Sequence, residues 1–81
     1  MSVDISAPAR KRSVILSGHA TSITLEDPFW AALKSLAQKK GVTVTTLINQ
    51  VDRTRGQNTL SSAVRLFILG ALQDTHNNKP H

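Results

Sequence analysis

The chain has 81 residues, enough for one small domain and too few for two. Ten Lys and Arg against five Asp and Glu give a formal net charge of +5, while 40% of the residues are apolar, which excludes a disordered polycation. There is no cysteine, so disulfides and thiolate metal sites are excluded as sources of stability. A homodimer is therefore expected, because oligomerisation is the remaining common way to enlarge the core of so short a chain.

The apolar runs are too short for a membrane span. The longest, residues 66–72, falls far short of the about 20 residues that a span needs, and the N-terminus contains no apolar signal segment. We therefore expect a cytoplasmic protein with no membrane partner. The positive charge favours an acidic partner, with nucleic acid ahead of acidic proteins.

The N-terminal residues 1–12 have no periodic apolar pattern and are predicted to form a flexible basic arm. The arm ends in three consecutive cations, Arg10, Lys11 and Arg12. Because a predicted strand follows closely, these cations are candidates for DNA phosphate contacts. The alternative is a charge run that only adds solubility.

The segment at residues 20–25 alternates in the way that a half-buried strand does. Ile23 and Leu25 fall on one side, which predicts that they face the core. The other side carries small or polar residues, Ala20, Ser22 and Thr24. A short exposed ribbon is the natural interpretation.

Two helices are predicted after the ribbon. Asp27 can cap the first, with Pro28 at its first turn, and Lys39-Lys40-Gly41 ends it. Thr43 can cap the second helix, which runs to about residue 55, where Gly56-Gln57-Asn58 breaks the pattern.

A third helix is predicted from a cap at residue 58 or 59 to Leu72. It is apolar on almost every side, which a surface helix of a monomer should not be. A subunit interface on its second side explains this pattern. We therefore divide the chain into an arm at residues 1–12, a folded domain at 13–73 and a disordered tail at 74–81.

The order of these elements resembles the ribbon-helix-helix family of bacterial DNA-binding proteins. A strand is followed by an Asp-Pro helix start, a helix that ends in Lys-Lys-Gly, and a second helix opened by Val-Thr-Val-Thr-Thr. This resemblance covers residues 20–55. Residues 21–26, Phe29-Trp30 and residues 60–65 further resemble a subgroup with an additional C-terminal helix. The expected fold is mostly α-helical with a short β-ribbon, a ribbon-helix-helix domain in an intertwined homodimer with a third, C-terminal helix.

The resemblance implies that one strand from each subunit pairs antiparallel and that the pair enters the DNA major groove. A second copy would supply the partner that an isolated strand lacks in its own chain. The implied base contacts are Ala20, Ser22 and Thr24. The implied phosphate contacts at the start of the second helix are Thr43, Val44 and Thr45. The expected dimer core consists of Ile23, Leu25, Trp30, Leu47, Ile48 and Phe67.

Two features depart from the family pattern. The outward ribbon positions are often Arg, Lys, Gln or Asn in the family, whereas the small residues found here make no bidentate base contacts. An apolar run at residues 14–16 also precedes the ribbon and could pair with it as a hairpin through the turn candidate at residues 17–19. How the ribbon meets a groove is therefore left open.

Other charged residues are less informative. Lys34, Lys39 and Lys40 are interpreted as a solvated face and helix-end complement rather than as phosphate contacts. Three arginines could equally pair with Asp52 and Asp74 or touch phosphate, namely Arg53, Arg55 and Arg65.

No arrangement of residues indicates an enzyme. His19, His76 and His81 lack the spacing of a metal site, and Ser61-Ser62 lacks the G-x-S-x-G elbow of a nucleophile. The five carboxylates do not group into an acid and base pair. Trp30 lies at core spacing, which favours packing over base stacking. We expect no catalysis, no metal and no cofactor.

Three functions remain open. The first is a dimeric DNA-binding transcriptional regulator, such as a repressor, in the bacterial cytoplasm at the nucleoid. The second is an antitoxin-like module that binds another protein through the tail, although that tail is short and has almost no apolar groups. The third is a dimeric scaffold that kept the fold and lost DNA binding, which the uncharged ribbon permits. No pattern specifies an operator, a regulated process or an effector.

Overall fold

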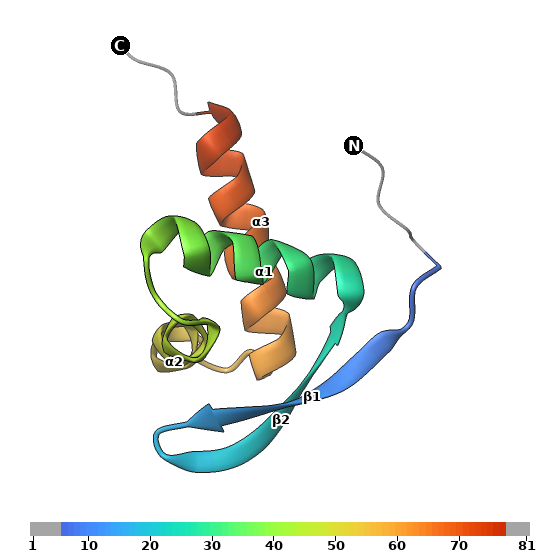
Figure 1. Ribbon diagram of the computed structural model, residues 1–81, viewed down its shortest axis with the longest axis vertical. Helices are drawn as coiled ribbons and strands as arrows, with labels where there is room; N and C mark the ends of the chain where they lie inside the picture. The colour runs from blue at the N-terminus through green and yellow to red at the C-terminus, as the bar shows by residue number, and fades with distance from the viewer. Residues whose placement is uncertain (1–5, 78–81) are drawn as a thin grey trace.

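The computed structural model describes residues 6–77, with side chains to residue 74. A two-stranded hairpin is followed by three helices (Figure 1). The elements are β1 (Ala9–Leu16), β2 (His19–Glu26), α1 (Asp27–Lys40), α2 (Val44–Thr54) and α3 (Leu60–Asn77). The hairpin crosses one end of the molecule, and α3 passes behind α1 and extends beyond it at the other end. The predicted architecture of one short ribbon and three helices is confirmed for the single chain.

The ribbon is completed within one chain. β1 pairs antiparallel with β2, from Ala9 opposite Glu26 to Leu16 opposite His19. Ser17 and Gly18 join the strands with φ values of 50° and 82°, as a two-residue type I′ turn requires. The hairpin that the sequence left open is thus formed. The expectation that β2 lacks a partner in its own chain is wrong, because β1 pairs with it along one edge.

The hairpin also changes the N-terminal boundary of the domain. The flexible arm predicted for residues 1–12 is wrong from Ala9 onwards, because residues 9–12 belong to β1. The first five residues of that arm lie outside the described part of the chain. The folded domain therefore begins at Ala9 rather than at residue 13.

The helix boundaries follow the predicted signals with one exception. Gly41 ends α1 in a left-handed conformation with φ of 70°, and Thr43 Oγ1 caps α2 by accepting the Thr46 N–H at 3.0 Å. Asp27 is not the cap of α1. The cap position is Glu26, without a side-chain hydrogen bond, and the Asp27 carboxylate binds Arg12 instead.

The third helix is longer than its pattern predicted. Thr59 Oγ1 accepts the Ser62 N–H at 3.1 Å, which confirms residue 59 as a cap. α3 then continues past Leu72 to Asn77. The tail predicted for residues 74–81 is therefore wrong for residues 74–77, and residues 78–81 lie outside the described part.

The core lies between the inner face of the hairpin and the three helices. Its buried residues are Val14, Ile23, Leu25, Leu33, Leu36, Ala37, Leu47, Ile48, Val51, Ala63, Val64 and Ile68. Ile23, Leu25, Leu47 and Ile48 were expected in a dimer core, yet one chain buries each of them almost completely. Their burial needs no second copy. Trp30 and Phe67 are partly buried against the same cluster.

Candidate nucleic-acid interface

The hairpin presents one exposed face, which we call the outer face. Opposite residues of an antiparallel pair share a face, so the register assigns residues of both strands to it. The outer face consists of Lys11, Ser13, Ile15, Ala20, Ser22 and Thr24, all of them exposed, and ends at the pair Ala9 and Glu26, of which Glu26 is half-buried. The three predicted base contacts therefore lie together on a solvent-facing surface. Their role in DNA binding stays a prediction.

The inner face anchors the hairpin to α1 through Arg12. Arg12 is opposite Ile23, so its side chain shares the inner face. Its guanidinium binds the Asp27 carboxylate and lies 4.8 Å from the centroid of the Trp30 ring. Arg10 contacts the same carboxylate, with 3.4 Å between Nε and Oδ2. Of the three cations predicted to touch phosphate, Arg10 and Arg12 are thus engaged within the chain, and Lys11 has no ion pair among the described residues.

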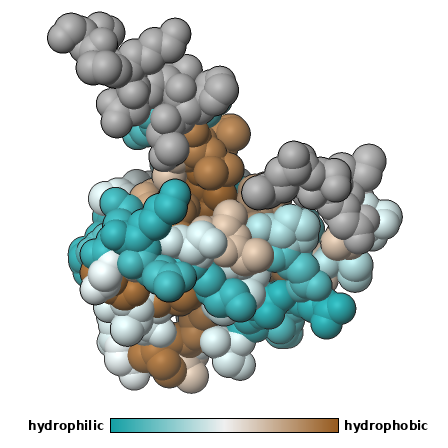
Figure 2. Space-filling view, turned by 45° about the horizontal axis from the view of Figure 1, so that its top comes forward, coloured by the Kyte–Doolittle hydropathy of each residue, from teal (hydrophilic) through white to brown (hydrophobic). Residues whose placement is uncertain are grey.

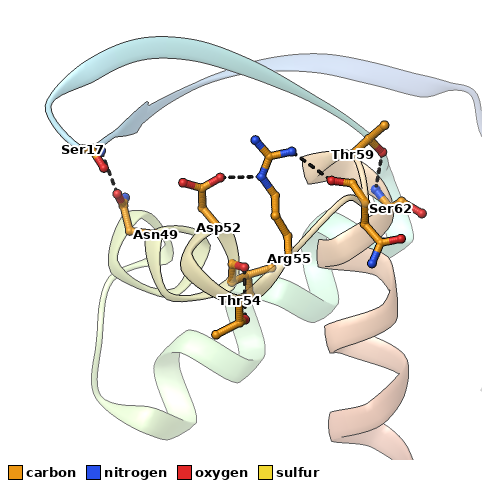
Figure 3. A network of polar contacts seen from close by, with 9 residues as sticks. Ser17, Asn49, Asp52, Thr54, Arg55, Thr59 and Ser62 are labelled. Carbon is orange, nitrogen blue, oxygen red and sulfur yellow. Dashed lines mark hydrogen bonds and ion pairs between the residues drawn. The ribbon is translucent and has the colours of Figure 1, made fainter.

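Asn49 of α2 holds the tip of the hairpin at the free edge of β1 (Figure 3). Its side-chain Nδ2 donates to the carbonyl oxygens of Ile15 and Thr45, both at 2.8 Å, and its Oδ1 accepts the Ser17 N–H at 2.9 Å. These bonds satisfy backbone groups that β2 does not reach. They also fix the position of the tip relative to α2.

Helix α3 holds the base of the hairpin at the other edge. The Thr24 N–H donates to Ser61 Oγ at 3.1 Å, and Arg65 donates to both carboxylate oxygens of Glu26, at 2.9 and 3.2 Å. The guanidinium also lies 5.7 Å from the centroid of the Phe29 ring. A backbone hydrogen bond and then the bond from Arg65 lower the pKa of Glu26. Its negative charge at the end of β2 is thereby balanced by Arg65.

The N-terminus of α2 lies close to the hairpin tip. Thr45 comes one helical turn, about 6 Å along the axis, before Asn49, which contacts the tip. Thr43 Oγ1 is used by the cap, and the N–H groups of Val44 and Thr45 have no partner within the described chain. The predicted phosphate-binding amides are therefore near the ribbon. Their contact with phosphate stays a prediction.

The remaining cations fall into two groups. Arg55 is paired, because its Nε donates to Asp52 Oδ1 at 2.7 Å and its Nη1 donates to the Asn58 carbonyl at 2.9 Å (Figure 3). Arg65 pairs with Glu26 rather than with Asp74. The exposed cations without an ion pair in the described chain are Lys11, Lys34, Lys39, Lys40 and Arg53.

Sequence reasoning placed Lys11 in an arm and missed its position on the outer face, directly opposite Thr24. The signal was available in the alternation of Arg12, Val14 and Leu16, which points those side chains inward and Lys11 outward. The run of three consecutive cations was instead interpreted as a basic arm.

In the described part of the chain, no group of three or more His, Cys, Asp and Glu side chains could hold a metal ion. Nor does any helix there combine the length and hydropathy needed to cross a membrane.

A family model described as a ribbon-helix-helix domain matches residues 9–72, which include the hairpin and most of α3. The chain belongs to the ribbon-helix-helix family. A solved structure of an uncharacterized protein from Bordetella pertussis Tohama I is similar, with a TM-score of 0.73 and 32% sequence identity. The similarity covers 93% of this ribbon-helix-helix chain and 65% of the Bordetella protein, so the chain spans just under two thirds of that protein. Among curated proteins, no relative matches the sequence.

Proposed function

We propose that this protein is a DNA-binding transcriptional regulator that inserts the outer face of its hairpin into the major groove. The observation that carries the proposal is the outer face itself. It is exposed along both strands, and its side chains have no hydrogen-bond partner in the described chain. The major groove of B-DNA admits a two-stranded ribbon, which this chain completes by itself.

Lys11 supports base reading more strongly than the small residues of the ribbon do. It is the single cation among the outer-face residues defined above, and it stands opposite Thr24. An ammonium can donate to guanine O6 and N7, and the Thr methyl can pack against a thymine methyl. Lys11 and Thr24 together therefore form a candidate base-reading pair at one step of the groove.

Phosphate contacts would supply most of the affinity. The free N–H groups at the start of α2 lie near the hairpin tip, where an anion is favoured by the amides and by the helix dipole. The unpaired cations on α1 and α2 add positive charge. Members of the family typically bind DNA as dimers, and a second copy would present a second hairpin to a neighbouring half-site.

The test is selection of bound fragments from a random DNA pool, followed by affinity measurements on the selected site and on random duplex over a range of salt concentrations. Each neutralised phosphate should contribute about 0.9 to the slope of log K against log salt. We expect a steep slope on both DNAs and a preference for the selected site. A flat slope with no selected site would contradict the proposal and favour the scaffold that lost DNA binding.

A matched pair of lysines separates base reading from general charge. Lys11→Ala should weaken binding to the selected site by about tenfold, the size of one base contact of roughly 1.4 kcal/mol, and weaken random DNA much less. Lys34→Ala removes an exposed, unpaired cation from α1 and should affect both DNAs slightly and equally. Equal losses in the two variants would show that the outer face does not read bases at Lys11.

A further inference from the structure

The tip of the hairpin carries a large apolar side chain that the core does not use. Ile15 lies on the outer face and is 48% exposed. The other exposed large apolar side chains of the described chain are three leucines of α3. Figure 2 shows apolar surface over the part of α3 that extends beyond α1, at the other end of the molecule from the hairpin tip. Ile15 is therefore separate from that surface.

Strand propensity does not explain why residue 15 is an isoleucine. β-branched residues favour strands whether or not they are apolar, and the hairpin uses threonine at the exposed positions Thr21 and Thr24. An exposed apolar side chain on an edge strand also adds a risk of aggregation. Residue 15 thus exposes an apolar group where threonine satisfies the same backbone preference.

The backbone around Ile15 is fixed. Asn49 Nδ2 donates to the Ile15 carbonyl at 2.8 Å, and Asn49 Oδ1 accepts the Ser17 N–H at 2.9 Å (Figure 3). Leu16, the next residue, turns to the inner face and packs against the core. The β-branched side chain of Ile15 is itself restricted at χ1. Ile15 therefore forms a rigid apolar ridge, and little conformational entropy is lost when a ligand covers it.

The surroundings of Ile15 fit DNA better than another protein. Its neighbours on the outer face are small, with Ser13 on the same strand and Ala20 directly opposite, and Lys11 adds a positive charge farther along. The chain as a whole carries a net charge of +5. A specific protein interface buries at least about 1,000 Å² around an apolar centre, which one side chain among small polar residues does not provide.

The apolar group that base pairs display in the major groove is the methyl group at C5 of a pyrimidine. Thymine carries this methyl group, and cytosine carries it when it is methylated. We propose that Ile15 binds the C5-methyl group of a pyrimidine when the outer face lies in the groove. Ala20 lies opposite, with about 5 Å between the two Cβ atoms in such a pair, and extends the apolar surface. This inference rests on the DNA binding proposed above and adds the base chemistry that the hairpin tip selects.

The position of Lys11 predicts where the methyl group lies. Lys11 and Ile15 are four residues apart on one strand, so their side chains stand about 13 Å apart on the outer face. Base pairs follow one another every 3.4 Å or so, roughly, along the DNA axis, and about 13 Å therefore spans about four base pairs at most. The bound methyl group should lie within about four base pairs of the guanine that Lys11 contacts.

The first experiment changes only the DNA and does not depend on the folding of any variant. In the site selected from a random pool, each thymine is replaced in turn by uracil, which lacks the methyl group and pairs in the same way. One replacement should weaken binding of the wild-type protein about fourfold, the effect of burying one methyl group. If every uracil site is bound like the thymine site, Ile15 does not bind a methyl group.

Two further duplexes distinguish the sources of the methyl group. At the same position, the affinity for a 5-methylcytosine·guanine pair is compared with that for a cytosine·guanine pair. A gain from the methyl group in both comparisons would assign the tip to either pyrimidine, and a gain with thymine alone would assign it to thymine. Binding that keeps its salt slope and its preference without any gain from a methyl group would overturn this inference alone. Absence of DNA binding would overturn the proposed function with it.

The second experiment identifies the side chain that binds the methyl group. Ile15→Ala should abolish the fourfold difference between the thymine and uracil sites, whereas Ile15→Val, which keeps a branched apolar side chain, should retain most of it. The control Ser13→Ala, at the neighbouring outer-face position, should leave the difference unchanged. Circular dichroism should show wild-type helicity in all three variants, because both positions are exposed. A fourfold difference that persists in Ile15→Ala would show that another residue binds the methyl group and would overturn the inference.

Discussion

The two faces of the hairpin differ sharply although their residues alternate along the same strands. On the inner face, Val14, Ile23 and Leu25 are 6%, 1% and 0% exposed and form part of the core. On the outer face, neighbouring residues such as Ser22 and Thr24 are exposed. Stability and the proposed recognition of DNA thus fall to adjacent residues, because a strand turns successive side chains to opposite sides. A substitution on the outer face should therefore leave the stability of the fold unchanged, and its effect should be confined to the proposed DNA binding.

Leu25→Asp should have the largest effect, because it places a charge in the middle of the core. Burying an unpaired carboxylate costs more than a small domain can lose, so we expect a destabilisation above about 4 kcal/mol and an unfolded chain. Circular dichroism and urea unfolding would measure it. The control is Thr24→Asp, one residue away on the outer face, which should fold with stability within about 0.5 kcal/mol of wild type. A folded Leu25→Asp would contradict the assignment of faces.

Thr43→Ala should reduce stability and DNA binding together, because Thr43 caps the helix whose N-terminus lies near the hairpin tip. Loss of a cap costs about 1 kcal/mol of unfolding free energy and loosens the amides proposed to face phosphate. Binding to selected and random DNA should weaken by similar factors. Thr45→Ala, which removes an exposed hydroxyl without a capping role, should keep wild-type stability. Weakening confined to the selected site would argue against a phosphate contact at this helix end.

Thr24→Ala should distinguish the role of the outer face in DNA binding from the role of the inner face in stability. The side chain is exposed, so the unfolding free energy should not change, whereas binding to the selected DNA should fall by about 1 kcal/mol, the low end for one base contact. Random DNA should be bound as before. Gln50→Ala, an exposed substitution on α2, serves as the neutral control. If Thr24→Ala keeps both affinity and preference, the outer face does not read bases at Thr24.

Local signals in the sequence predicted much of this fold. The parity of residues 20–25 predicted which side chains face the core, and Gly41, Thr43 and Thr59 act at the helix ends as expected. These features depend on residues within a few positions of one another. Periodicity and capping chemistry therefore suffice to predict them.

The errors concern contacts between residues far apart in the sequence. Arg12 looked like part of a solvated basic arm, because nothing local indicates that Asp27 and Trp30 receive it. For the same reason the pairing of β1 with β2 was left open by the sequence, and the family resemblance implied a strand supplied by a second copy. Pairing between Arg65 and Glu26 is equally non-local. Tertiary contacts between distant residues decided each of these cases.

Glu26→Gln should have the smallest effect on stability. It tests a residue at the end of β2 that contributes to stability although it does not lie on the inner face. Glu26 stands opposite Ala9 at the end of β2, yet Arg65 binds its carboxylate. Because the pKa of Glu26 is lowered in the folded state, its contribution to stability is fully present above the ordinary value of 4.5 and is lost as the pH falls through the lowered value. Glu26→Gln should therefore be less stable than wild type in urea unfolding at neutral pH, and the difference should shrink in acid. The control Asp74→Asn, at an exposed carboxylate with no ion pair in the described chain, should leave the unfolding free energy at neutral pH within about 0.5 kcal/mol of wild type. A difference independent of pH would mean that Arg65 does not stabilise the charged form, and that α3 holds the hairpin through Ser61 instead.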